Sequence, residues 1–198
     1  MVNRQIDSHS RNCAALNLTA IKIELVNEAA TAALARRFGA QISSSIGLAT
    51  QANTRFIPLL VYLHGDLGAG KTFFVRSLLH SLGFCGRVKS PTFTLMESYA
   101  IAQPSGATVH AYHFDFYRFE GGSDWREAGF EEVLPGDGLA LVEWPEKAAG
   151  LPLADIEITF TLGAIESERT ATLQSHTGRG QQLLSSIDLA AADLTANR

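Results

Sequence analysis

The sequence predicts an α/β protein, a compact single domain in which a mixed β-sheet is flanked by helices. Residues 57–64 form a short apolar run with the length of a buried strand. A glycine-rich segment follows at residues 65–72, and the apolar side chains of residues 73–82 then repeat at helical spacing until Gly83 ends the helix. A strand, a glycine-rich loop and a helix in this order predict a P-loop nucleotide-binding fold.

The glycine-rich segment at residues 65–72 reads GDLGAGKT and fills every fixed position of the pattern G-x-x-x-x-G-K-[ST]. Its glycines allow the loop to curl, so that backbone N–H groups can surround a phosphate. The dipole of the following helix favours the same anion. Lys71 is expected to reach the β- and γ-phosphates, and the Thr72 hydroxyl to ligate Mg²⁺. The alternative, a glycine-rich turn with an incidental lysine, is disfavoured by the flanking strand and helix.

The composition is that of an ordinary folded domain. The 198 residues are 46% hydrophobic and 18% charged. The net charge of −4 and the pI near 5.8 imply that any contact with nucleic acid is local or made through a partner. Cys13 and Cys85 lack metal-binding spacing and predict a reducing compartment. With no apolar run of membrane-spanning length and no signal-peptide pattern, we expect a cytoplasmic protein.

The N-terminal third contains one strand and one helix. Residues 1–19 are polar and aperiodic, and we expect them to be disordered. Residues 21–25 alternate as a half-exposed strand, and Asn27 is a candidate N-cap for a helix over 28–38. Residues 41–55 are rich in Ser, Thr and Asn. They either extend this helix or form a long loop, and the pattern does not decide.

The middle of the chain predicts an antiparallel hairpin. Residues 93–101 and 108–116 read as strands with a Pro-Ser-Gly turn between them. His110 and His113 are three residues apart in the second strand and therefore face opposite sides. This spacing disfavours a shared metal and predicts ordinary packing.

The last third predicts short helical turns at residues 124–134 and a buried strand at 139–142. A second hairpin is expected between residues 156–162 and 171–174, followed by a helix at 181–189 and a frayed end at 190–198.

Two features beyond the loop point to nucleotide chemistry. Glu143 directly follows the apolar strand at 139–142, where a nucleotide hydrolase places a carboxylate for Mg²⁺ or for the attacking water. Thr92 and Thr94 flank Phe93 just after Pro91, and in a nucleotide-binding protein a Thr hydroxyl or the backbone of such a segment can sense the metal and the γ-phosphate. The segment around Thr92 is equally consistent with a simple loop that enters a strand.

Four co-linear segments resemble the TsaE (YjeE) family, the bacterial ATPases required for threonylcarbamoyladenosine in tRNA. The resemblance spans roughly residues 20–189, and SHTGRG at 175–180 is similar to that family's C-terminal signature. The four segments are GDLGAGKT at 65–72, SPTFT at 90–94, HFDFYR at 113–118 and EWPE at 143–146.

The resemblance implies a weak ATPase that acts with other proteins. Residues 20–189 would form a P-loop ATPase domain that hydrolyses ATP to ADP and phosphate. Its partners would be TsaD and TsaB, which transfer threonylcarbamoyl to adenosine 37 of tRNAs reading codons that start with A. Contact with tRNA would then be indirect, through that complex.

The resemblance also implies roles for individual residues. Glu143, Asp115 and Lys71 would be catalytic, and Thr72, Glu143 and Asp115 would lie at the metal. Asp115 is equally consistent with a structural carboxylate that pairs with Arg118. The nucleotide would contact Asp66, Leu67, Gly68, Ala69, Gly70, Lys71, Thr72, Phe73, Thr92 and Trp144.

The chain departs from the family pattern in two places, and two other functions are alternatives. The stretch 41–55 is longer than the family pattern, and the N-terminal extension has no counterpart in it. A small-molecule kinase is the main alternative function, with Arg118 and Arg126 as lid arginines. A non-enzymatic tRNA-binding module is disfavoured by the acidic pI and the lack of a basic, aromatic stripe.

Overall fold

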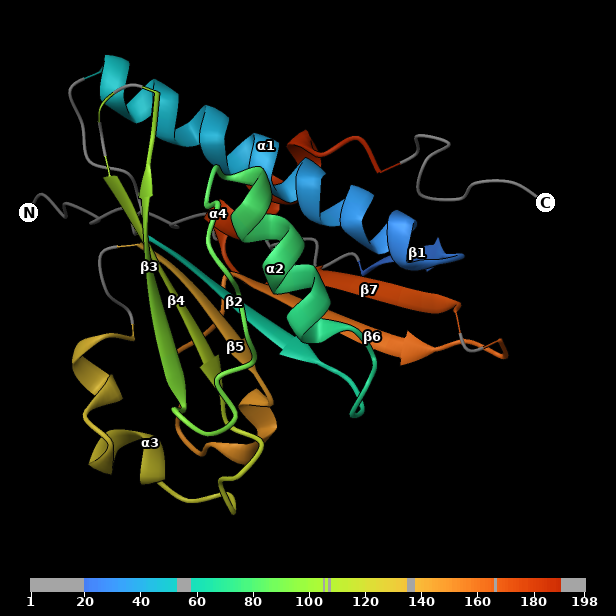
Figure 1. The fold of residues 1–198 in the computed structure, drawn as a ribbon, viewed down its shortest axis with the longest axis vertical. Coiled ribbons are helices and arrows are strands. Elements are labelled where there is room, and N and C mark those ends of the chain that lie inside the picture. Colours follow the sequence, from blue (N-terminus) through green and yellow to red (C-terminus); the bar gives the residue numbers. More distant parts are fainter. Residues whose placement is uncertain are drawn as a thin grey trace, which may run out of the picture.

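Seven strands of the computed structural model form one mixed sheet in the order β1-β7-β6-β2-β5-β4-β3 (Figure 1). The structure describes residues 20–52, 58–104, 106, 108–134, 138–165 and 167–189, so the expectations for 1–19 and 190–198 lie outside it. The strands are β1 (Ile21–Leu25), β2 (Leu59–His64), β3 (Met96–Ala102), β4 (Thr108–Asp115), β5 (Gly138–Glu143), β6 (Ile156–Leu162) and β7 (Arg169–Ser175).

The helices differ greatly in length. Among the described residues, the α-helices are α1 (Glu28–Gln51), α2 (Lys71–Ser81), α3 (Asp124–Glu127) and α4 (Gly178–Ser186), and the 3₁₀ turns are η1 (Phe130–Glu132) and η2 (Pro145–Lys147). None of the helices in this part of the chain is both long and apolar enough to cross a membrane.

The centre of the sheet is parallel and its edges are antiparallel. Strands β4, β5, β2 and β6 run in the same direction, while β3 pairs antiparallel with β4, and β7 pairs antiparallel with β6 and β1. The predicted mixed sheet and both predicted hairpins are confirmed. The first hairpin strand begins at Met96, not at residue 93, because Leu95 N–H bonds to Pro91 O in a tight turn.

Helix α1 answers the open question for residues 41–51, while residues 53–55 lie outside the described part of the chain. The helix continues to Gln51 because Ile42 and Ile46 extend the buried stripe of Leu34 and Phe38 at a spacing of four residues. Asn27 caps it as predicted, since its Oδ1 accepts Ala30 N–H at 2.9 Å. The part of this stretch up to Gln51, which is longer than the family pattern, is therefore a continuation of one helix.

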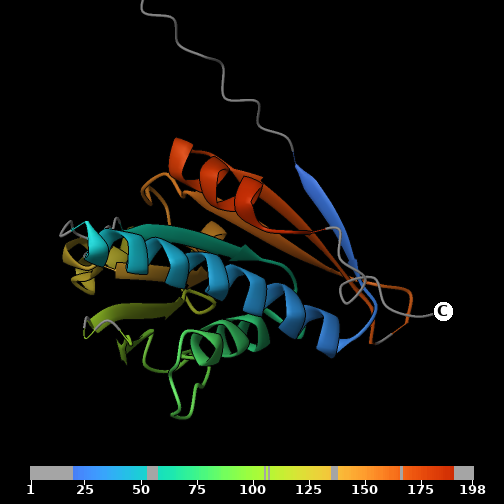
Figure 2. The ribbon, with the colours of Figure 1, turned by 90° about the horizontal axis from the view of Figure 1, so that it is seen from above.

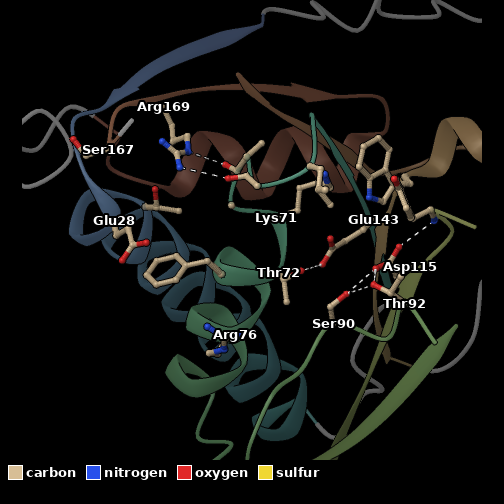
Figure 3. A pocket seen from close by; sticks show the side chains of 18 residues that line it. Glu28, Lys71, Thr72, Arg76, Ser90, Thr92, Asp115, Glu143, Ser167 and Arg169 are labelled. Carbon is tan, nitrogen blue, oxygen red and sulfur yellow. Dashed lines mark hydrogen bonds between the residues drawn. The ribbon is translucent and has the colours of Figure 1, made fainter. Parts of the chain in front are cut away.

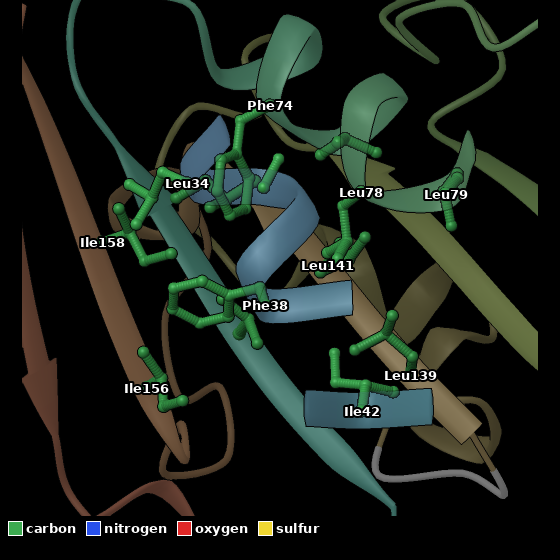
Figure 4. Close-up of a cluster of buried hydrophobic side chains, with 14 of the residues drawn as sticks. Leu34, Phe38, Ile42, Phe74, Leu78, Leu79, Leu139, Leu141, Ile156 and Ile158 are labelled. Atoms are coloured by element: carbon green, nitrogen blue, oxygen red, sulfur yellow. The ribbon is translucent and has the colours of Figure 1, made fainter. Parts of the chain in front are cut away.

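Helices α1, α2 and α4 cover one face of the sheet, and α1 lies between the other two (Figure 2). Side chains from α1 and α2 meet those of β5 and β6 in the main core (Figure 4). Phe74 of α2 packs edge-on against Phe38 of α1, with ring centres 5.7 Å apart. This packing fixes the direction in which α2 leaves β2, and therefore the position of the loop between them.

A second, aromatic core lies on the opposite face of the sheet. Phe114 and Phe116 pack there against Phe130 of η1, and the buried Trp125 of α3 joins the same cluster. The short helical turns predicted at 124–134 are thus confirmed, and their aromatic side chains explain why they fold. Helix α4 begins at Gly178 and ends at Ser186, three residues before the predicted range at each end.

Candidate nucleotide-binding site

The loop at residues 65–70 joins β2 to α2 at the edge where the parallel strands end. Gly68 and Gly70 adopt left-handed φ angles of 80° and 105°, which glycine tolerates best. At Gly65 a Cβ atom would lie 2.3 Å from Phe160 O, so a side chain does not fit there. No side chain caps the start of α2. Its first backbone N–H groups therefore remain available to an anion.

Lys71 is buried at the centre of this loop, with 4% of its surface exposed. Its Nζ donates to the backbone carbonyls of Gly65 and Asp66 and lies 3.9 Å from the centre of the Trp144 ring. Burial lowers the pKa of Lys71, although nearby carboxylates, Glu143 foremost, act in the opposite direction. The loop therefore holds a desolvated cation where the pattern predicts a phosphate contact.

Glu143 ends β5, and its carboxylate is hydrogen-bonded to the residue that follows the P-loop lysine. Its Oε1 accepts the hydroxyl of Thr72 at 2.7 Å and the ring N–H of His113 at 2.8 Å. Its side chain is 4% exposed. The carboxylate therefore reaches the first turn of α2, as the apolar strand before it predicts.

Asp115 ends the neighbouring strand β4, directly opposite Glu143 in the ladder. Its Oδ2 accepts the hydroxyls of Ser90 at 2.7 Å and Thr92 at 2.6 Å. The alternative pairing with Arg118 is not observed, because that guanidinium lies over the exposed ring of Phe93. Asp115 instead anchors the loop that carries Thr92.

These groups line one cavity of about 520 Å³ (Figure 3). Asp66 does not line it and contributes only its carbonyl to Lys71. The sequence-predicted residues on its wall are Leu67, Gly68, Ala69, Gly70, Lys71, Thr72, Phe73, Thr92, Asp115, Glu143 and Trp144.

The cavity also has walls that sequence reasoning missed. Arg169, at the start of β7, donates its Nε–H to the P-loop carbonyl of Ala69 at 3.2 Å. No spacing rule connects residues 100 positions apart, and only the fold brings them together. The other unpredicted lining residues are Glu28, Thr31, Arg76, Ser90, Tyr117 and Ser167.

The prediction about the two histidines needs refinement. His110 and His113 do face opposite sides of β4, as predicted. His113 not only packs in the core but also forms a hydrogen bond to Glu143. The second acid of the EWPE segment, Glu146, bonds to His64 Nδ1 at 3.1 Å and does not line the cavity. Burial raises the pKa of Glu146, but the bond from His64, a backbone N–H and the nearby positive charges together outweigh burial and leave the pKa below the usual value.

The fold and this loop define a P-loop protein of mixed α/β architecture. The family model described as Threonylcarbamoyl adenosine biosynthesis protein TsaE matches residues 25–171. The chain belongs to the TsaE family, which takes part in tRNA threonylcarbamoyladenosine biosynthesis.

Relatives and a solved structure support this membership. The chain is 38% identical over 129 residues to the tRNA threonylcarbamoyladenosine biosynthesis protein TsaE of Haemophilus influenzae, covering 65% of this chain and 78% of that one. It is 46% identical over 90 residues to the Rickettsia felis TsaE protein, covering 44% of this chain and about half (48%) of the relative. The crystal structure of Bacillus subtilis YdiB is similar with a TM-score of 0.61 at 27% identity, over 85% of this chain and 93% of that one.

Proposed function

We propose that this chain is an ATPase that binds ATP with Mg²⁺ and hydrolyses it to ADP and phosphate. It would do so in support of the TsaB–TsaD complex, which forms threonylcarbamoyladenosine at position 37 of tRNAs reading A-starting codons. The observation that carries this proposal is the meeting of Lys71, Thr72 and Glu143 in one cavity. Family membership and the names of the relatives support the pathway.

The donors in the cavity fit a magnesium nucleotide. The uncapped start of α2, the curled glycine loop and Lys71 supply the N–H groups and the positive charge that a triphosphate needs. The Thr72 hydroxyl and the Glu143 carboxylate are hard oxygen donors 2.7 Å apart, the type that Mg²⁺ prefers. Mg²⁺ keeps several waters, so it does not need a cage of protein ligands. The described part of the chain offers no cluster of three or more His, Cys, Asp or Glu side chains for a metal.

Each side chain has a role that follows from its position. Lys71 would neutralise charge on the β- and γ-phosphates, and Thr72 with Glu143 would hold the metal; Asp115 lines the same cavity. Bound Mg²⁺ would neutralise the charge that develops on the phosphate oxygens. Glu143 orients the attacking water, and Thr92, tied to Asp115, responds to the γ-phosphate. Catalysis is then mainly positioning and electrostatic stabilisation.

The kinase alternative was based on Arg118 and Arg126 as lid arginines, and neither of them lines the cavity. Arg126 instead bonds to Gly150 O at 2.9 Å, on the far side of the sheet. Incubation with labelled ATP separates the two functions, because a hydrolase releases free phosphate and a kinase labels its acceptor.

Formation of threonylcarbamoyladenosine in a reconstituted system tests the proposal. TsaB, TsaD, tRNA and the threonylcarbamoyl donor are supplied with no addition, with this chain or with its Lys71→Ala variant. We expect sustained turnover only with the unaltered chain. Such a pathway would place the protein in the cytoplasm. Equal turnover in all three samples, with compatible partners, would remove the pathway role.

A further inference from the structure

Trp144 has an unusual backbone conformation and directly follows the carboxylate that ends β5. Its φ and ψ are 58° and 47°, and it is one of two described non-glycine residues with a left-handed φ. Such a conformation persists only where the contacts around it hold it in place. From this position the ring lies 3.9 Å from Lys71 Nζ and packs against the Tyr117 ring, with centres 5.1 Å apart. The cover over Lys71 therefore depends on what fixes the turn at residues 144–147.

Two contacts fasten this turn to the end of β2. The Trp144 N–H donates to Leu63 O at 3.3 Å, and His64 Nδ1 lies 3.1 Å from Glu146 Oε2. An ionised carboxylate only accepts, so His64 Nδ1 carries the hydrogen. The first contact joins two backbones and is open to almost any residue, whereas the second requires a side-chain donor at position 64.

His64 is also joined to the other side of Lys71. It directly precedes Gly65, whose carbonyl accepts a hydrogen bond from Lys71 Nζ. Glu146 does not line the nucleotide cavity, so it acts on the site either through Trp144 or through its charge. One imidazole thus links the carbonyl that holds Lys71 to the turn whose ring covers it.

A second carboxylate lies on the other side of the His64 ring. The Oε2 of Glu157, on β6, is 3.7 Å from His64 Nε2 and 3.4 Å from His176 Nε2. Within the described residues neither Nε2 atom forms a hydrogen bond, so the His64 ring makes its hydrogen bond there to Glu146. His176 faces the same Glu157 oxygen but is not paired with Glu146, which makes it a matched comparison for His64.

We propose that His64 is a positioning residue for the nucleotide site: through Glu146 it holds the Trp144 ring over Lys71 before the phosphates arrive. The inference rests on the proposed function only in taking ATP as the ligand. A cation beside an aromatic face is attracted to that face, and more strongly where water is excluded. A ring that is already in place lowers the cost of ordering the site when the nucleotide binds.

Glu143 is held independently of this contact. Its Oε1 accepts from Thr72 and His113, and neither bond involves His64. The loss of His64 should therefore weaken ATP binding and leave the hydrolytic step nearly unchanged.

The test uses the full chain with Trp125→Phe, so that Trp144 is the sole tryptophan. Emission is recorded without nucleotide, binding of ATP with Mg²⁺ is measured by calorimetry, and steady-state kinetics give kcat and KM. For His64→Leu we expect red-shifted Trp144 emission, a Kd for ATP raised about fivefold or more, and kcat within about twofold. His64→Asn places an amide N–H near the position of Nδ1 and should restore the Kd to within about twofold.

Two comparisons separate the bond to Glu146 from other effects of these side chains. His176→Leu removes an imidazole from the same Glu157 oxygen and should change the Kd less than about twofold. Glu146→Ala should behave like His64→Leu. Glu146→Gln keeps an acceptor for His64 but removes a charge that acts on Lys71, and it should remain close to the unaltered chain.

Four outcomes overturn the inference. The first two are unchanged Trp144 emission in His64→Leu and an equal loss of affinity in His176→Leu. Equal losses in His64→Leu and His64→Asn would mean that the ring acts by packing, and equal losses in Glu146→Ala and Glu146→Gln would mean that the charge acts directly on Lys71. Thermal unfolding confirms that the variants fold. The nucleotide-free emission needs no ATP, so a chain that hydrolyses none would count against the ATPase proposal alone.

Discussion

His113 donates its Nε2–H to Glu143 Oε1 at 2.8 Å, and both side chains are almost completely buried. His113 lies on β4 and Glu143 on the adjacent β5, so the bond crosses between neighbouring strands. Within the described part of the chain, the Nδ1 of His113 has no hydrogen-bond partner, so the ring makes its hydrogen bond there through Nε2, to Glu143. The same Oε1 also accepts the Thr72 hydroxyl. Glu143 is therefore oriented before any nucleotide arrives.

Replacement of His113 should slow hydrolysis through Glu143. His113→Leu removes the donor at similar bulk, and we expect kcat to fall about tenfold or more while ATP affinity changes little. His113→Gln places an amide N–H near the same point and should restore most of the rate. Steady-state ATPase kinetics with separate kcat and KM values provide the measurement. If His113→Gln and His113→Leu are equally slow, the histidine acts through packing and not through its bond to Glu143.

Replacement of Glu143 itself should separate binding from hydrolysis. Glu143→Gln keeps the shape but removes the charge that holds the metal and orients water. We expect ATP binding by calorimetry to remain within a few-fold and hydrolysis to fall about a hundredfold. Normal turnover in this variant would transfer the catalytic role to Asp115, and Asp115→Asn is the comparison to make.

The parts of the site that could be predicted are those whose residues are close in sequence. The strand, loop and helix around Lys71 are consecutive, and Glu143 follows its own buried strand, so local patterns suffice. His113 and Arg169 act on groups 30 and 100 residues away, and these contacts depend on strand order and register. Sequence spacing carries no information on either.

The fold shows the same division. Hairpins and helical turns were predictable from alternation and turn residues, whereas the continuation of α1 to Gln51 was not. Its last turns are rich in Ser, Thr and other residues of weak helix preference. Only the burial of Ile42 and Ile46 against the core decides for helix there.

Trp144 should report nucleotide binding by fluorescence. It lines the cavity, and its ring lies over Lys71, whereas Trp125, the only other tryptophan, is buried in the aromatic core on the opposite face. Entry of a phosphate beside Lys71 changes the charge near the Trp144 ring. We therefore expect ATP to shift the emission of the unaltered chain and of Trp125→Phe, but not of Trp144→Phe. A shift that survives in Trp144→Phe would place the nucleotide elsewhere.

The segment at 175–180 is explained by a buried carboxylate and not by the nucleotide cavity. Asp155 is 1% exposed and accepts the Leu60 backbone N–H at 3.0 Å, the Thr177 hydroxyl, and Arg179 at 3.1 Å. The Thr177 hydroxyl in turn caps α4 by accepting Gly180 N–H at 3.2 Å. One side chain thus joins the start of β2 to the start of α4.

Asp155→Ala should therefore destabilise the fold without changing the nucleotide site directly. It leaves the buried Leu60 N–H without its acceptor and removes one of the two partners of Arg179, which also donates to Pro58 O, and we expect the free energy of unfolding to fall by about 3 kcal/mol. Arg179→Ala should cost less, because the Arg179 side chain is 48% exposed and water can replace its contact. Denaturant unfolding gives both values, since a lower midpoint with an unchanged m-value identifies a loss of stability. If both variants lose the same small amount, the carboxylate serves only as a surface ion-pair partner, and the link between β2 and α4 must lie in the apolar contacts of α4.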